Sequence, residues 1–463
     1  MRKLFACVVA ALIAVAAVPT QAKTPRDALV MAFQIDDIIS LDPAEIFEFT
    51  AAEYAGNTYD RLIGYEYNNV SNIYGVAAES WTISDDGKTF TFKMRPGIVF
   101  PSGNPMTAED AAFSLQRAIV LDKSPAFILT QFGFTADNVK DKIKAVDDMT
   151  LVIETDKAYA PTFVLYCLTA TISSIVDKKL VMEHEQDGDL GYNWLKTNYA
   201  GVGPFKLRQW KPNESLTLDR NDDYWGGAPA MKRVIIRHIV EPATQQLLLE
   251  KGDIDIARNL GPDQLSTVRN NADTYIQEGV KGAIYYLGLS QKNEALSKPK
   301  VREALKYLID YKGMEGTVVK DLMTIHQAFL PKGFLGALEA RPYTLDINKA
   351  KELLAEAGYP NGFKVTMDTR NTSPIMEMAQ SIQSTFAQAG VELEIIPGDG
   401  GQTLGKYRAR NHDIYIGRWG PDYQDPHTNA DTFARNPDNS DDAKSKPLAW
   451  RNAWDIPEMT KMA

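Results

Sequence analysis

Signals for β-strands and α-helices alternate along almost the whole chain, and this alternation limits the possible fold more than any other feature of the sequence. Three segments are typical of β-hairpins, because apolar and aromatic runs flank a short turn of Asp, Gly, Pro or Asn: residues 81–94, 143–155 and 205–218. Amphipathic helical patterns stand between and after them. Over 463 residues, this pattern predicts an α/β protein with several domain-sized units rather than one large core.

The periodicity of apolar residues also predicts individual elements. The expected strands are 28–33, 363–368, 391–396 and 413–416, and the expected helices are 50–63, one that opens at the N-cap Thr107, 299–309, 347–357 and 374–388. We expect Gly358 and Gly390 to end the last two helices, because glycine easily adopts the left-handed conformation that follows a helix. Residues 422–447 are rich in Asp, Asn and Pro and are interpreted as a long loop.

The first 22 residues have the pattern of a secretory signal peptide. Arg2 and Lys3 precede an apolar run from Leu4 to Val18, and Thr20-Gln21-Ala22 is a small-x-small cleavage sequence. The run is shorter than the roughly 20 residues that span a bilayer, so export with cleavage is favoured over a membrane anchor. Removal of this segment would change the net charge from −10 to −12. A balance this acidic argues against nucleic-acid binding.

The two cysteines exclude an internal disulfide in an exported chain. Cys7 lies within the predicted signal, so Cys167 is the only cysteine that would remain. Its neighbours are apolar and aromatic, and we therefore interpret it as a buried structural thiol.

Motifs that would support catalysis or a bound cofactor are missing from the sequence. His184-Glu185 has no second histidine at the spacing of a zinc protease, and neither a Gly-x-Ser-x-Gly elbow nor a phosphate-binding Gly-rich loop occurs. We expect no metal site, no cofactor and no enzyme activity. A secreted hydrolase is retained as an alternative, because 60 acidic residues could hold an unrecognised catalytic pair.

Six segments, in order along the chain, resemble the family 5 extracellular solute-binding proteins of ABC importers, the group that contains dipeptide-, oligopeptide- and nickel-binding proteins. Any one segment alone would be a weak signal, but six in order make chance implausible. The segments are Leu41-Asp42-Pro43; residues 78–97, continued by 100–110; Gly203-Pro-Phe205 with Trp210; Asp223-Tyr-Trp-Gly-Gly227; residues 301–305 with Ile309-Asp310; and Gly417-Arg-Trp-Gly-Pro-Asp-Tyr-Gln-Asp-Pro426.

The resemblance implies a two-lobed periplasmic binding protein of the cluster C type, whose lobes close on a ligand by a hinge motion. Residues 1–22 would be the signal peptide, residues 23–65 with 200–286 would form lobe I, and residues 66–199 would be a subdomain inserted into lobe I. Residues 287–463 would form lobe II. Family members continue for several dozen residues beyond this point, so we expect lobe II to be incomplete and the C-terminal part of the fold to be missing.

The implied function is the periplasmic substrate-binding component of an ABC transporter, with a small peptide as ligand and a permease in the inner membrane as partner. The protein would act as a monomer. Carried onto this sequence, the aspartate that receives the ligand ammonium is Asp422, and a cap of its own loop is the alternative role. Trp419 and Tyr423 would form walls of the cleft, or else pack in the core.

The resemblance implies three further ligand contacts. Arg370 lies within one residue of the position at which dipeptide binders place a carboxylate-binding arginine, but those proteins follow it with Pro-Tyr and this chain follows it with Asn371-Thr372. Phe49 and Thr50 would contact the ligand from lobe I. The same fold could instead bind a nickel chelate, an opine or an oligosaccharide, and a non-functional truncated copy is a further alternative.

Overall fold

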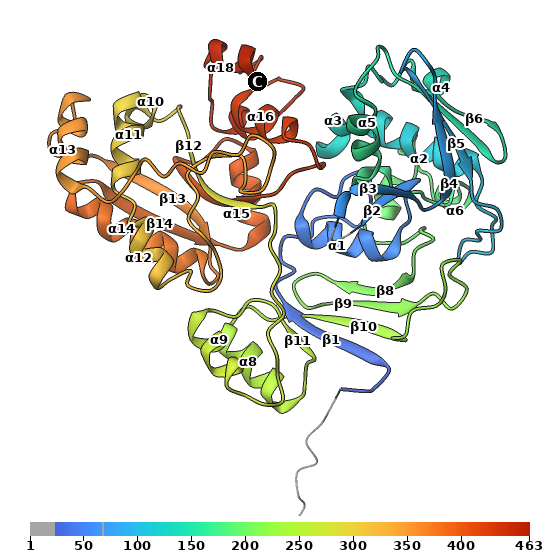
Figure 1. The fold of residues 1–463 in the computed structure, drawn as a ribbon, viewed down its shortest axis with the longest axis horizontal. Helices are drawn as coiled ribbons and strands as arrows, with labels where there is room; N and C mark the ends of the chain where they lie inside the picture. Colours follow the sequence, from blue (N-terminus) through green and yellow to red (C-terminus); the bar gives the residue numbers. More distant parts are fainter. Residues whose placement is uncertain (1–23, 67–68) are drawn as a thin grey trace, which may run out of the picture.

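The computed structural model describes residues 24–66 and 69–463, so the predicted signal peptide lies outside the described residues. Figure 1 shows two bodies side by side. The N-terminal body comprises the elements from β1 to α9, and the C-terminal body comprises those from β12 to α18. Within the described ranges, no helix is long and apolar enough to cross a membrane.

The first sheet of the N-terminal body has the strand order β11-β1-β10-β9-β8. Strand β1 runs parallel to both of its neighbours, and the hairpin of β8 and β9 continues the sheet in antiparallel fashion. Its core buries Phe33, Tyr54 and Leu216. The elements are β1 (Ala28–Phe33), α1 (Phe49–Thr58), β8 (Phe205–Lys211), β9 (Ser215–Arg220), β10 (Arg233–His238), α8 (Pro242–Lys251), β11 (Ile256–Ala257) and α9 (Pro262–Arg269).

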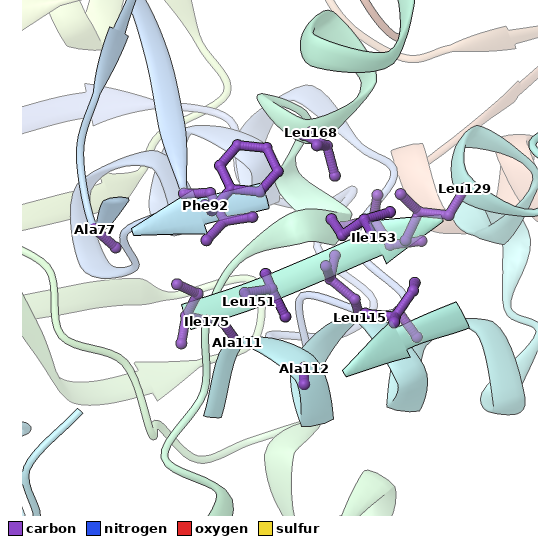
Figure 2. Packing of buried hydrophobic residues seen from close by; sticks show 14 of the residues in the cluster. Ala77, Phe92, Ala111, Ala112, Leu115, Leu129, Leu151, Ile153, Leu168 and Ile175 are labelled. Carbon is purple, nitrogen blue, oxygen red and sulfur yellow. The ribbon is translucent and has the colours of Figure 1, made fainter. Parts of the chain in front are cut away.

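The second sheet of the N-terminal body has the order β4-β5-β7-β6, with helix α2 packed against it (Figure 2). Strands β4 and β5 form the hairpin expected over residues 81–94, and Phe90 and Phe92 of β5 are fully buried. The elements are β2 (Ile63–Glu66), β3 (Asn69–Gly75), β4 (Ala78–Ile83), β5 (Thr89–Met94), α2 (Ala108–Leu121), α3 (Phe127–Thr130), α4 (Val139–Lys142), β6 (Ile143–Asp147), β7 (Thr150–Glu154), α5 (Pro161–Leu168), α6 (Lys178–Glu183) and α7 (Tyr192–Leu195).

Helix α2 begins as its sequence predicts. The Thr107 hydroxyl accepts a hydrogen bond from the backbone N–H of Glu109, and the Asp110 carboxylate accepts one from the backbone N–H of Thr107. These two bonds satisfy donors that a helix N-terminus otherwise leaves free. The expected N-cap is confirmed.

The C-terminal body is built on a sheet of order β12-β15-β13-β14, in which β13 runs parallel to β14 and β15 and β12 runs antiparallel to β15. Gly358 and Gly390 have φ angles of 91° and 83°, and both follow a helix as predicted. The elements are β12 (Ile284–Leu289), α10 (Glu294–Ser297), α11 (Pro299–Tyr307), α12 (Tyr311–Gly316), α13 (Ile347–Glu356), β13 (Lys364–Arg370), α14 (Ile375–Gln388), β14 (Glu392–Gly398), α15 (Gly400–Arg408), β15 (Ile414–Trp419), α16 (His427–Ala434), α17 (Leu448–Arg451) and α18 (Pro457–Met462).

Two predictions of local structure were wrong. The helix expected over 50–63 ends at Thr58, because the backbone becomes extended at Tyr59, and Ile63 already begins β2. The loop expected over 422–447 contains helix α16, four of whose inward positions are Thr428, Asn429, Thr432 and Ala434. Because these residues are polar or small, the sequence has no helical periodicity of apolar residues here, and the helix could not be predicted from it.

Cys167 lies in the core of the second sheet, with its side chain fully buried. Burial raises the pKa of its thiol well above the ordinary value, because the thiolate would lose its solvation. The expected structural role is confirmed, since a thiol of this kind is inert.

Besides its two larger sheets, the N-terminal body contains a two-stranded sheet of β2 and β3. We propose that the two larger sheets correspond to the predicted lobe I and to the subdomain inserted into it, and the C-terminal body to lobe II. The separate cores of the three larger sheets support this division. Strand β12 begins at Ile284, three residues before the predicted start of lobe II, and pairs with β15 in the sheet of the C-terminal body.

Candidate ligand-binding site

The end of β15 and the turn that follows it hold three of the predicted site residues, and this turn contacts the N-terminal body. Trp419 is the last residue of β15, and Asp422 and Tyr423 lie in the turn that leads to α16. The ring of Tyr423 lies 5.5 Å from the ring of Phe163 in α5 of the N-terminal body. Tyr423 therefore lies where the C-terminal body meets the N-terminal body, with Asp422 beside it in the turn, whereas Trp419 packs within the C-terminal body.

The carboxyl group of Asp422 has almost no protein partner. Its Oδ2 accepts one long hydrogen bond, of 3.4 Å, from the Thr428 hydroxyl, and among the described residues no lysine, arginine or histidine nitrogen lies within 4.0 Å of it. The residue is half-buried, and burial raises the pKa of its carboxyl from 3.8 to about 7. The charged form of Asp422 thus lacks a counter-ion, and a cation placed beside it would relieve the cost of its desolvation and favour ionisation.

Trp419 and Tyr423 are almost closed to solvent. The ring of Trp419 lies 5.3 Å from the ring of Phe433 in a perpendicular arrangement, and the hydroxyl of Tyr423 shares a hydrogen bond of 2.9 Å with Nδ1 of His427. Both side chains thereby hold the turn around Asp422 in place. Their role as cleft walls stays a prediction.

Arg370, at the end of β13, reaches across to the N-terminal body. Its guanidinium pairs with Asp36, and its Nη1 lies 3.4 Å from Oδ2 of Asp37. The backbone N–H of Gly400 also donates to Asp36, at 2.9 Å. Burial acts to lower the pKa of Arg370, but the two carboxylates outweigh this effect and raise it. In this structure, Arg370 therefore joins the two bodies, and its expected role toward a ligand carboxylate stays a prediction.

A second ion pair crosses the same contact. Nη2 of Arg408, the last residue of α15, lies 2.8 Å from Oε1 of Glu48, whose side chain is buried. Burial raises the pKa of Glu48, although Arg408 acts in the opposite direction. Phe49 is 43% exposed and lies under the guanidinium of Arg418 at 4.1 Å, whereas Thr50 is buried in the first turn of α1. The structure therefore brings Phe49, but not the side chain of Thr50, to an open part of this contact.

Sequence reasoning missed three charged residues of this region: Glu48, Arg408 and Arg451. Each is one of many charged residues in the chain, and no motif marks it. The pairing of Glu48 with Arg408 joins residues 360 positions apart. This ion pair can be recognised only in the folded protein, where the two bodies are in contact.

Comparison with known proteins identifies the family to which this chain belongs. The family model described as "Bacterial extracellular solute-binding proteins, family 5 Middle" matches residues 72–441, well over half of the chain. The chain is 30% identical, over 413 residues, to the Escherichia coli K12 protein named "Probable D,D-dipeptide-binding periplasmic protein DdpA". That alignment covers 88% of this chain and 77% of the relative.

Two further matches agree with this assignment. The glutathione-binding protein GsiB of Escherichia coli K12 is 27% identical, with 78% of this chain and 68% of the relative covered. The periplasmic binding protein DppA of Helicobacter pylori, solved with the peptide STSA, superposes with a TM-score of 0.76 at 27% identity, over 87% of this chain and 79% of that one. The expected two-lobed fold and periplasmic location are confirmed. The chain belongs to the family 5 bacterial extracellular solute-binding proteins.

Proposed function

We propose that this protein is the peptide-binding component of an ABC importer and that Asp422 receives the ammonium group of the peptide. The observation that carries the proposal is the state of the Asp422 carboxyl. It is half-buried, lacks an ion-pair partner among the described residues and lies at the contact of the two bodies. A charge-assisted hydrogen bond to an ammonium would satisfy it.

The relatives support a peptide as the ligand. One is named for D,D-dipeptides and another for glutathione, and the Helicobacter pylori protein was solved with a four-residue peptide. These ligands share a free amino group beside a short backbone. A carboxylate that binds this amino group can accept peptides with different side chains, because all of these peptides carry the amino group.

The remaining parts of the proposal follow from membership of a solute-binding family. The loaded protein would deliver its ligand to an ABC permease in the inner membrane and would act as a monomer. It would release the ligand unchanged, with no catalytic step. Among the described residues, no cluster of three or more His, Cys, Asp or Glu side chains could hold a metal ion.

A thermal-shift experiment with mixtures of di- to pentapeptides tests the proposal. Ligand that binds only the folded state stabilises it by about 2.7 kcal/mol at a concentration of 100 times Kd. We therefore expect a rise in Tm of several degrees with peptides that have a free N-terminus. Mixtures of the same peptides with acetylated N-termini are the matched control and are expected to give little or no shift.

Ligands of other chemical classes test whether the ligand is a peptide. Nickel chelates, opines and oligosaccharides are tested alongside the peptides. A shift given by one of these classes and by no peptide would show that the fold is retained with a different cargo. Hydrolysis of a peptide, ester or glycoside by the purified protein would contradict a role limited to binding.

A further inference from the structure

Arg451 is a buried arginine without an acidic partner. It ends helix α17 and is 9% exposed. Its Nε donates to the backbone carbonyl of Lys446 at 3.3 Å. Among the described residues, no carboxylate oxygen lies within 4.0 Å of its guanidinium, and its two terminal nitrogens make no hydrogen bond.

The neighbours of Arg451 make this lack of a partner costly. Its guanidinium lies 5.5 Å from the ring centre of Tyr407, within a cluster of aromatic side chains. Burial lowers its pKa, and the nearby positive charge of Arg408 lowers it further. Its two terminal nitrogens keep some contact with solvent, and a negative charge beside them would offset the burial of the guanidinium and its repulsion by Arg408.

Two arginines at the contact between the two bodies are paired with acids. Arg370 faces Asp36 and Asp37, and Arg408 faces Glu48. Among the described residues of this region, Asp422, Asp425, Arg418 and Arg451 form no ion pair. Arg418 is exposed and Asp425 accepts a backbone hydrogen bond of 2.9 Å from His427, whereas Arg451 is buried and Asp422 has only its long bond to Thr428.

Asp422 and Arg451 belong to neighbouring segments of the C-terminal body and are more than 4.0 Å apart. Helix α17 packs against α16, and Thr428 of α16 holds Asp422. Arg451 is also the strongest influence that lowers the pKa of Asp422. One anion and one cation, both buried or half-buried and both unpaired, are complementary to a small molecule with opposite charges at its two ends.

We propose that Arg451 binds the carboxylate of the ligand whose ammonium faces Asp422. The C-terminal body would then bind both charged ends of a short zwitterionic peptide. This assignment rests on the proposed function. It gives the ligand-carboxylate role to Arg451 rather than to Arg370, which the acids of the N-terminal body already neutralise. It also favours ligands of a few residues, because both charged ends must meet groups of one body.

A double-mutant cycle on the ligand carboxylate tests the assignment. The probe is the tightest-binding peptide of the di- to pentapeptide panel, together with the same peptide as its C-terminal amide. We expect amidation to weaken binding to the wild-type protein by about 100-fold, since it leaves a buried charge unpaired. In the Arg451→Gln protein, the acid and the amide should bind within about threefold of each other, and Arg451→Lys should retain part of the preference for the acid.

The matched control is Arg302→Gln. Arg302 is half-buried in α11, where it donates to the carbonyls of Leu296 and Ser297 and lies over Trp454. This variant should keep the full preference for the acid.

The Tm of ligand-free Arg451→Gln should equal or exceed that of the wild type, because the change removes an unpaired buried charge. Equal losses of affinity for acid and amide in Arg451→Gln, with a lowered Tm, would show a structural role and overturn the assignment. An amidation effect in Arg451→Gln as large as that in the wild type would also overturn it, while leaving the proposed function intact. If no peptide binds the wild-type protein, the proposed function fails, and this assignment with it.

Discussion

At pH 8, the Asp422→Asn protein is expected to bind peptide at least roughly 100-fold more weakly than the wild type and yet to unfold at a higher temperature. The loss of affinity follows because an amide cannot form an ion pair with the peptide ammonium, which is left desolvated in the site. The gain in stability follows because burial disfavours the charged form of this carboxyl, and raises its pKa from 3.8 to about 7. Asparagine has nearly the same shape and no charge to desolvate.

The sign of the pH dependence follows from proton binding. The folded protein holds the Asp422 proton more tightly than the unfolded chain does, so the free energy of unfolding falls as pH rises from about 4 to about 7. Above pH 7 the cost is complete and amounts to roughly 2–4 kcal/mol. The difference in Tm between Asp422→Asn and the wild type should therefore be largest at pH 8 and should disappear below pH 4. Scanning calorimetry at both pH values measures it.

Asp425→Asn is the matched control. Asp425 lies three residues away in the same turn, is half-buried, and accepts a hydrogen bond from the backbone N–H of His427, which an asparagine oxygen can also accept. It should change neither the affinity nor the Tm difference between pH values to a comparable degree. An Asp422→Asn protein that keeps its affinity would remove Asp422 from the binding site.

The second large effect is expected at a buried ion pair that fastens α2 to the turn after β1. Nη1 and Nη2 of Arg117 donate to the two oxygens of Asp42 at 2.8 and 2.6 Å, and the side chains are 2% and 0% exposed. In Asp42→Ala, the guanidinium stays buried without its counter-ion. We expect the free energy of unfolding to fall by about 3–5 kcal/mol and Tm by roughly 6–10 °C, measured by denaturant and thermal unfolding.

Two further variants separate the charge from the packing. Asp42→Leu combined with Arg117→Met removes both charges and should regain much of the lost stability, because a buried pair of apolar residues can replace an ion pair. Glu356→Ala breaks an exposed ion pair with Lys300 and should change the free energy of unfolding far less than Asp42→Ala does, because solvent screens an exposed pair. Equal losses from Asp42→Ala and Glu356→Ala would contradict this interpretation.

The sequence predicts the elements of this fold where apolar residues recur at a regular period. The hairpin around Asp86-Gly87 follows from alternation, the strand at 28–33 from a short continuous apolar run, and the start of α2 from its cap. Helix α16 could not be predicted in this way, because its buried face is largely threonine and asparagine. Periodicity of hydrophobic residues carries no information about a helix that buries polar side chains.

The candidate site divides in a similar way. Asp422 could be named in advance because it lies within a recognisable segment of the chain. Arg451 could not, because what distinguishes it is the absence of a partner, and this depends on where Glu48, Asp36 and Asp37 come to lie in the folded protein. The same fact explains why Arg370 was expected to be free for a ligand, whereas the structure shows it in contact with acids more than 330 positions away.

The most direct test of the account is a calorimetric titration that compares one peptide with its N-acetylated form on the wild-type and the Asp422→Asn proteins. If Asp422 receives the peptide ammonium, acetylation should weaken binding to the wild type by roughly 100-fold or more and have little effect on Asp422→Asn, since the interacting charge is already absent. Equal affinities of the free and acetylated peptides for the wild type, or the same acetylation loss in both proteins, would contradict it.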